Sequence, residues 1–234
     1  MHNGKVYNEI KQGILDYFND RNIDLQEIYD WLLNNQNNLN SIFLLGYFNY
    51  SGIGISENNE KAFNLFINAS GQNHSLAQYY VGECYEFGNG TVKDEKLAFE
   101  YYKKVANKGI VAGEFKVGYF YAYGIGIEKD AKLAIYWYEK AANSGHLLAM
   151  YKLGNNYRKG EGGVEKNYDK AFELYQKAAN LGYSKAQHNL AVMYENGDGI
   201  RDGDDLLGSV QVPISRTNFS VRVSSSQFSS ANSI

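Results

Sequence analysis

An apolar residue followed by a small one recurs along the chain at nearly constant intervals. The small residues are Gly46, Gly82, Gly118, Gly154 and Ala191, which gives spacings of 36, 36, 36 and 37 residues. A Gly-x-Gly sequence begins six residues after each of them. Self-similarity at a period of roughly 20 to 50 residues is typical of repeat architectures. The pattern therefore predicts a row of similar units along most of the chain.

A second pattern lies between these small residues. An alanine is followed by Phe or Tyr four residues later and by a pair of mostly small residues seven residues later, at Ala62, Ala98, Ala134 and Ala171. Spacings of i, i+4 and i+7 mark one face of an α-helix. The pattern therefore predicts two antiparallel helices in each unit, and in the second unit they should lie at 77–87 and 95–108.

Polar residues bracket the predicted second helices. Asn or Asp stands four residues before each alanine, where its side chain can accept a hydrogen bond from a free N–H group of the first turn. Gly or Asn follows each second helix and suits the left-handed conformation of a helix C-terminus. The starting residues are Asn58, Asp94, Asp130 and Asn167, and the ending residues are Asn73, Gly109, Gly145 and Gly182.

The glycines inside the first helices indicate close contacts. A glycine within a helix costs about 0.5 to 1 kcal/mol relative to alanine, so its return at one register implies a compensating gain. We expect a neighbouring helix to approach there, backbone against backbone, at Gly46, Gly82, Gly118 and Gly154. The Tyr and Phe side chains of the second helices should fill the space between helices, with hydroxyl groups that reach solvent or a backbone carbonyl.

The repeated unit resembles the Sel1-like repeat, a relative of the tetratricopeptide repeat. The resemblance rests on Leu-Gly-x-x-Tyr, Gly-x-Gly-Ile/Val, Asp, Lys-x-Ala and Lys-Ala-Ala-x-x-Gly within 36 residues, and it covers about 41–202. It implies an all-α fold, a right-handed superhelix (α-solenoid) of antiparallel helix pairs. It also implies an adaptor or scaffold that presents a curved surface to protein partners and has no catalysis of its own.

These patterns divide the chain into three segments. Residues 1–40 are expected to form an N-terminal helical cap with an Asn-rich linker, because an apolar helical stripe and a capping box precede the repeats. Residues 203–234 are rich in serine, and such low complexity predicts a disordered tail. Between them, the repeats are expected at 41–76, 77–112, 113–148 and 149–185, with a half repeat at 186–202.

The fifth unit should lack its second helix. Where an Ala-x-x-x-Tyr helix is due, the chain continues with Leu-Leu-Gly-Ser and then Pro213. The remaining helix, at 186–196, should leave an apolar face open. Three occupants of that face are conceivable: a second copy of the chain in a homodimer, a different partner, or the tail.

Composition narrows the class of partner. The net charge is −3 and 21% of the residues are charged, so nothing attracts nucleic acid or an anionic membrane. No apolar run approaches the ~18 residues of a membrane span, and the N-terminus carries no signal-peptide pattern. Cys84 is the single cysteine, which excludes an internal disulfide or a cysteine-cluster metal site. We therefore expect a cytoplasmic protein without nucleic-acid or membrane partners.

The candidate chemical motifs have structural explanations. None of the Gly-x-Gly sequences continues as a dinucleotide or phosphate-binding motif, and none follows a predicted strand. His74 and His146 occupy equivalent places in their units, so their place in the repeat explains them. Cys84 is expected to be a small buried residue of a first helix. We predict no catalytic residue, cofactor or metal site, and so no enzyme.

The surface of the first helices remains as the candidate site. In related superhelices the first helices line the concave face, so positions between their packing anchors are open to a partner. The leading hypothesis is a scaffold or adaptor that binds proteins or peptides there. The alternative is the recruiting or regulatory region of a kinase-associated signalling protein with kinase-pathway partners, because 24–50 resembles a segment of fungal families in which such repeats follow a kinase-like domain. The candidate residues, whose aromatic members have a second interpretation as half-buried packing, are Tyr79, Glu83, Glu86, Phe115, Tyr119, Ala122, Asn155 and Arg158.

Overall fold

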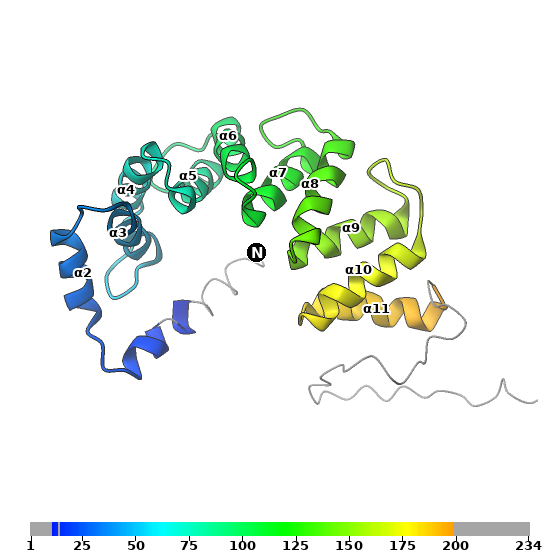
Figure 1. Ribbon diagram of the computed structural model, residues 1–234, viewed down its shortest axis with the longest axis horizontal. Coiled ribbons are helices and arrows are strands. Elements are labelled where there is room, and N and C mark those ends of the chain that lie inside the picture. Colours follow the sequence, from blue (N-terminus) through cyan, green and yellow to red (C-terminus); the bar gives the residue numbers. More distant parts are fainter. Residues whose placement is uncertain (1–10, 14, 199–234) are drawn as a thin grey trace, which may run out of the picture. The chain divides into compact units, whose positions relative to one another are not determined.

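The computed structural model describes residues 11–13 and 15–198 of the 234-residue chain, and every regular element within them is an α-helix (Figure 1). After α2 (Leu25–Asn34), the first helices of the units are α3 (Leu39–Ser51), α5 (Ser75–Phe87), α7 (Val111–Tyr123), α9 (Leu147–Lys159) and α11 (Ser184–Asn196). The second helices are α4 (Asn59–Gly71), α6 (Glu95–Ala106), α8 (Ala131–Asn143) and α10 (Tyr168–Asn180). The predicted all-α solenoid of helix pairs is confirmed.

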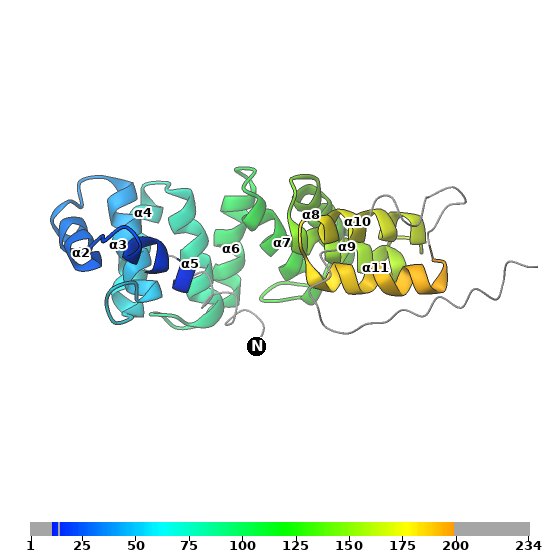
Figure 2. The same cartoon turned by 90° about the horizontal axis from the view of Figure 1, so that it is seen from below.

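Each helix from α3 to α11 packs chiefly against the helices directly before and after it in the chain. Figure 2 shows the same succession after a turn of 90°. The most extensive contacts join the two helices of one unit, as between α7 and α8 or between α9 and α10. Nearest-neighbour packing of this kind is how repeat proteins gain their stability.

The helix ends lie close to where the polar residues predict them. Each predicted N-cap side chain accepts a hydrogen bond from the backbone N–H group three residues later, at 2.9 to 3.0 Å, in Asn58, Asp94, Asp130 and Asn167. The residues predicted to end the second helices have positive φ angles of 70°, 73°, 88° and 89°, in Asn73, Gly109, Gly145 and Gly182. In the second unit, the first helix begins two residues before the expected 77, and the second ends two residues before the expected 108.

The Gly-x-Gly loops form the ends of the first helices. The first glycine of each loop is a left-handed C-cap, at Gly52, Gly88, Gly124 and Gly160. The second glycine lies against the preceding unit: a side chain at Gly90 would collide with the backbone carbonyl of Asn59 at the start of α4. Backbone meets backbone at Gly90 and Gly126, whereas Gly54 and Gly162 lie against the side chains of Leu25 and Ile135. These loops therefore help to fix how one unit sits on the next.

The buried glycines of the first helices face aromatic rings. A Cβ atom placed at any of the four would lie 2.7 to 2.8 Å from a ring carbon of the second helix of the same unit. The pairs are Gly46 with Phe66, Gly82 with Tyr102, Gly118 with Tyr138, and Gly154 with Tyr175. The close contact was expected, but the prediction of backbone against backbone is wrong. The glycine is needed because a buried ring crosses the helix at that point.

The second helices supply the rest of the core. The alanines four residues before each of these rings are 0 to 3% exposed, at Ala62, Ala98, Ala134 and Ala171. The tyrosine hydroxyl groups of these helices were expected to reach solvent or a backbone carbonyl, but two of them bond to side chains instead. The Tyr102 hydroxyl donates to the Glu86 carboxylate, and the Tyr175 hydroxyl donates to the Asn155 side-chain amide. The rings therefore connect the core to the side chains on the first helices.

The two ends of the described region frame the repeats. Asp24 caps α2 by accepting a hydrogen bond from the Gln26 N–H group at 2.8 Å, as the sequence predicts.

The predicted tail at 203–234 lies outside the described residues, as do most of the apolar residues of the helical stripe predicted in the N-terminal cap. Ala191 of α11, at the register of the buried glycines, is exposed. None of the helices in 11–13 and 15–198 combines the length and apolar character that a bilayer crossing needs.

Candidate functional site

Three positions of each first helix define a common surface. They lie three residues before, one after and four after the buried glycine, and we call them the first-helix surface. On α5, α7 and α9 all nine of these side chains are half-buried. They are Tyr79, Glu83 and Glu86 on α5, then Phe115, Tyr119 and Ala122 on α7, and Tyr151, Asn155 and Arg158 on α9. Half-buried side chains of this kind are partly ordered before any partner binds.

The α5 part of the surface is a polar cluster. The Glu86 carboxylate accepts hydrogen bonds from the Tyr102 hydroxyl at 2.6 Å and from the Lys116 ammonium at 2.7 Å. The Tyr79 hydroxyl lies 3.4 Å from Glu83 Oε1. Burial raises the pKa of Glu83, Lys116 counteracts this shift and Glu86 adds to it. The structure thus brings the three predicted α5 residues together, and Lys116 of α7 acts on the two glutamates among them.

The α7 part is mainly aromatic. The Phe115 ring stacks on the His146 ring at 4.4 Å between centroids and lies 5.8 Å from the Tyr138 ring. The Tyr119 ring lies 4.6 Å from that of Tyr123. Both rings pack against the buried core, and Tyr119 also has a neighbour, Tyr123, that is 55% exposed. Of the two, Tyr119 is the better probe of binding.

The α9 part carries amide and guanidinium groups. Asn155 Oδ1 accepts hydrogen bonds from the Tyr175 hydroxyl at 2.8 Å and from Asn189 Nδ2 of α11 at 3.4 Å. Arg158 Nε is buried and has no hydrogen-bond partner in the described part of the chain. Burial raises the pKa of Tyr175, and Arg158, which also interacts with the hydroxyl of that tyrosine, lowers it. The two predicted residues Asn155 and Arg158 thus lie in one polar cluster that includes a helix of the next unit.

Sequence reasoning missed the lysines that link successive first helices. Lys116 and Lys152 each stand two residues before a buried glycine. Each reaches back to the preceding first helix, where Lys116 pairs with Glu86 and the Lys152 ammonium donates to the Tyr123 hydroxyl at 2.7 Å. Their shared register could have revealed them, had positions been compared between units as well as within one helix.

The two equivalent histidines are helix caps. His74 and His146 stand directly before α5 and α9, and their Nδ1 atoms accept hydrogen bonds from the N–H groups of Ala77 at 3.1 Å and Ala149 at 3.3 Å. A ring nitrogen can accept only when it carries no proton. Burial lowers the pKa of both histidines, and Lys108 lowers that of His74 further. Place in the repeat therefore accounts for both residues.

The capping role predicts a loss of stability in mild acid. Because the folded state lowers the pKa of these histidines below 6.5, their contribution is present above pH 6.5 and is lost as the pH falls through the folded pKa. We expect the melting temperature to fall between about pH 7 and pH 5. The double variant His74→Asn/His146→Asn keeps a capping side chain that does not titrate, and its melting temperature should fall less. Parallel curves for the two proteins would contradict the capping role.

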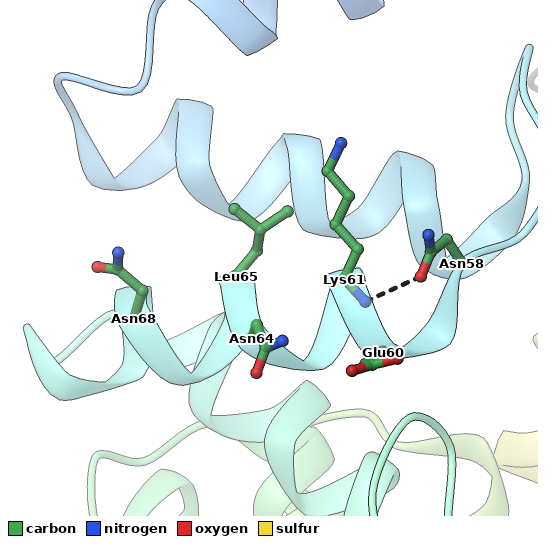
Figure 3. Close-up of a pocket in the computed structure, with 6 residues that line it drawn as sticks. All are labelled: Asn58, Glu60, Lys61, Asn64, Leu65 and Asn68. Atoms are coloured by element: carbon green, nitrogen blue, oxygen red, sulfur yellow. Dashed lines mark hydrogen bonds between the residues drawn. The ribbon is translucent and has the colours of Figure 1, made fainter.

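Two further features carry structural roles. Burial raises the pKa of the Cys84 thiol to about 12, as suits a small core residue. A shallow depression on α4 is lined by Asn58, Glu60, Lys61, Asn64, Leu65 and Asn68 (Figure 3). Its Asn58 caps the helix and its Lys61 ammonium donates to the Tyr29 hydroxyl at 3.0 Å. No three His, Cys, Asp or Glu side chains in the described residues are placed to share a metal ion.

The family model of the Sel1 repeat matches five stretches of the chain, at 39–74, 75–110, 111–146, 147–183 and 184–206. The chain belongs to the Sel1 repeat family. Each of the five Sel1 matches begins at the first residue of a first helix. Sel1 repeat proteins are in general helical scaffolds for protein interactions.

Two solved structures show the same Sel1 repeat architecture. A Sel1 repeat protein from Oxalobacter formigenes is 33% identical over 70% of this chain, with a TM-score of 0.67. The protective antigen c5321 of uropathogenic Escherichia coli, which displays an SLR fold, is 28% identical over 78% of this chain, with a TM-score of 0.69. The matched regions cover 66% and 40% of those two proteins. No curated protein sequence matches the chain.

Proposed function

We propose that the chain is a cytoplasmic scaffold or adaptor that binds proteins or peptides on its first-helix surface. The observation that carries the proposal is the alignment of half-buried polar and aromatic side chains at equivalent positions of α5, α7 and α9. Side chains of successive first helices contact one another, as Lys116 of α7 pairs with Glu86 of α5 and Asn189 of α11 donates to Asn155 of α9. One extended peptide can therefore contact more than one first helix.

The side chains on this surface suit specific recognition. Glu83, Tyr119 and Asn155 occupy the same register on three helices and present a carboxylate, a phenol and an amide in turn. Each is held by neighbours in its own cluster, so binding orders few additional rotamers. A partner whose own groups complement this carboxylate, phenol and amide in the same order should bind more tightly than one whose groups do not.

Affinity capture with matched variants tests the proposal. The wild-type chain, the double variant Glu83→Gln/Tyr119→Ala and a control variant Tyr136→Ala serve as baits in an extract of the source cells. Tyr136 is 51% exposed on α8, outside the first-helix surface. We expect the double variant to lose the wild-type partners and the control to keep them, with all three baits giving the same circular dichroism. Loss in the control alone would place binding on the second helices and contradict the proposal.

Two narrower proposals concern the partners. The resemblance of 24–50 to kinase-linked repeat proteins favours kinase-pathway components, so protein kinases should be enriched among the captured proteins.

The exposed Ala191 stands at a register that is buried in the other units, and this favours a homodimer through α11. Light scattering should then give twice the mass of the chain, and a monomer at every concentration would rule the dimer out.

A further inference from the structure

One pair of positions recurs between successive first helices, beside other contacts such as the hydrogen bond from Asn189 to Asn155. The residue four positions after the buried glycine of one first helix is paired with the residue two positions before the equivalent small residue of the next first helix. The pairs are Tyr50 with Tyr80, Glu86 with Lys116, Ala122 with Lys152, and Arg158 with Asn189. The first pair is a ring contact with centroids 5.6 Å apart, and the second is a salt bridge of 2.7 Å. The composition of this pair therefore sets the chemistry of each junction.

The junction between α5 and α7 is complete. The Glu86 carboxylate accepts from both the Tyr102 hydroxyl and the Lys116 ammonium, and the side chains of the ion pair are only 11% and 13% exposed. The Lys116 ammonium also lies 5.4 Å from the Phe87 ring centroid and 5.1 Å from the Tyr102 ring centroid. Two donors converge here on one carboxylate.

The junction between α7 and α9 repeats both donors. The Tyr138 ring lies on Gly118 as the Tyr102 ring lies on Gly82, and a Cβ atom added to either glycine would lie 2.8 Å from the ring. The Lys152 ammonium lies 5.1 Å from the centroid of Tyr123, which stands at the register of Phe87. The hydroxyl, the ammonium and the aromatic neighbour of the complete junction are therefore all present.

The acceptor is missing from this junction. Ala122 stands at the register of Glu86 and is half-buried. The Tyr138 hydroxyl is buried without a hydrogen-bond partner among the described residues. The Lys152 ammonium has no carboxylate within ion-pair distance in that part of the chain and donates only to the exposed Tyr123 hydroxyl. A buried hydroxyl without an acceptor destabilises the protein, and an acceptor that arrives later recovers that loss.

The neighbouring units do not share this gap. In the first unit the ring is Phe66, which has no hydroxyl to satisfy. In the fourth unit the Tyr175 hydroxyl donates to Asn155 at 2.8 Å. Among the four described rings at this register, Tyr138 is the one whose hydroxyl lacks an acceptor.

We propose that a carboxylate of a bound peptide occupies the position beside Ala122 that Glu86 occupies in the preceding junction. It accepts hydrogen bonds from the Tyr138 hydroxyl and the Lys152 ammonium. The Tyr123 side chain is exposed and the Lys152 side chain is half-buried, and the hydrogen bond between them must open to admit the carboxylate. The inference rests on the proposed function, because it names the chemical group that the first-helix surface recognises.

A randomised octapeptide library tests the proposal. The library is prepared in two forms, with a free and with an amidated C-terminus, and is selected on the wild-type chain and on Tyr138→Phe, Lys152→Met and Ala122→Glu variants. The first two remove one donor each, and the third supplies the carboxylate within the chain. Lys96→Met removes an exposed lysine of α6 and serves as the control.

The wild-type chain and the control should enrich peptides that carry a carboxylate by about tenfold, and the three variants should lose that enrichment. Enrichment of Asp or Glu in both library forms identifies a side chain, whereas enrichment confined to the free form identifies the C-terminus. Ala122→Glu should also raise the melting temperature by about 2 to 4 °C. Peptides selected without a carboxylate, and lost on Tyr119→Ala, would overturn this inference and leave the scaffold proposal standing. A wild-type chain that enriches no peptide would contradict both.

Discussion

Gly118→Leu should strongly destabilise the protein. A Cβ atom at this position would already lie 2.8 Å from Cδ1 of Tyr138 and 3.2 Å from Cβ of Trp137. The Tyr138 ring is 2% exposed and has no room to retreat. Overpacking of this severity costs ~3 kcal/mol, which lowers the melting temperature by about 6 to 12 °C for a chain of this size.

Gly71→Leu is the matched control for that experiment. Gly71 is the last residue of α4, and no atom lies within 4 Å of a Cβ placed there. Its replacement should change the free energy of unfolding by no more than about 0.5 kcal/mol. Chemical denaturation of both variants measures the difference. If the two substitutions had equal effects, the ring contact would not explain why glycine recurs in the first helices.

Glu86→Ala should destabilise the protein by a similar amount. The substitution leaves the Lys116 ammonium and the Tyr102 hydroxyl without their shared acceptor at a largely buried site. Breaking a buried ion pair from one side is more costly than losing a surface pair, and we expect a loss of ~3 kcal/mol. The measurement is the free energy of unfolding by denaturant titration.

Glu100→Ala provides the comparison for this second prediction. Glu100 is exposed on α6, so its removal should change stability by less than about 0.5 kcal/mol. Replacing both members of the ion pair in Glu86→Leu/Lys116→Met should recover part of the loss, since only the Tyr102 hydroxyl, and no charge, is then left without a partner. A loss of equal size at Glu86 and Glu100 would show that the junction contributes nothing beyond a surface charge.

The fold follows from local sequence signals because most of its determinants act over a few residues. Asn58 and Asp94 cap helices through the N–H group three residues later, and Gly109 needs only its own positive φ angle. The partner of a buried glycine is a different matter. The ring that covers Gly82 belongs to Tyr102 on another helix, so the period identified a close contact but not the group that makes it.

The sequence predicted which residues lie at the candidate site but not which side chains they contact. The register placed Glu86 and Ala122 on the first-helix surface, yet the group that binds Glu86 comes from Lys116, thirty residues further on. The histidine caps were missed for a similar reason, since Asn, Asp, Ser and Thr are the usual caps and a His74 ring in that role depends on how it stacks. Contacts between helices decide what each surface residue does.

The missing acceptor of the third unit is tested most directly by removing one hydroxyl from each of two equivalent tyrosines and comparing melting temperatures. Tyr102→Phe breaks the 2.6 Å hydrogen bond to Glu86 and should lower the melting temperature by about 2 to 6 °C. Tyr138→Phe removes a buried hydroxyl that has no acceptor among the described residues, so it should leave the melting temperature unchanged or raise it. Equal decreases in both variants would show that the Tyr138 hydroxyl already has an acceptor, and would contradict the account.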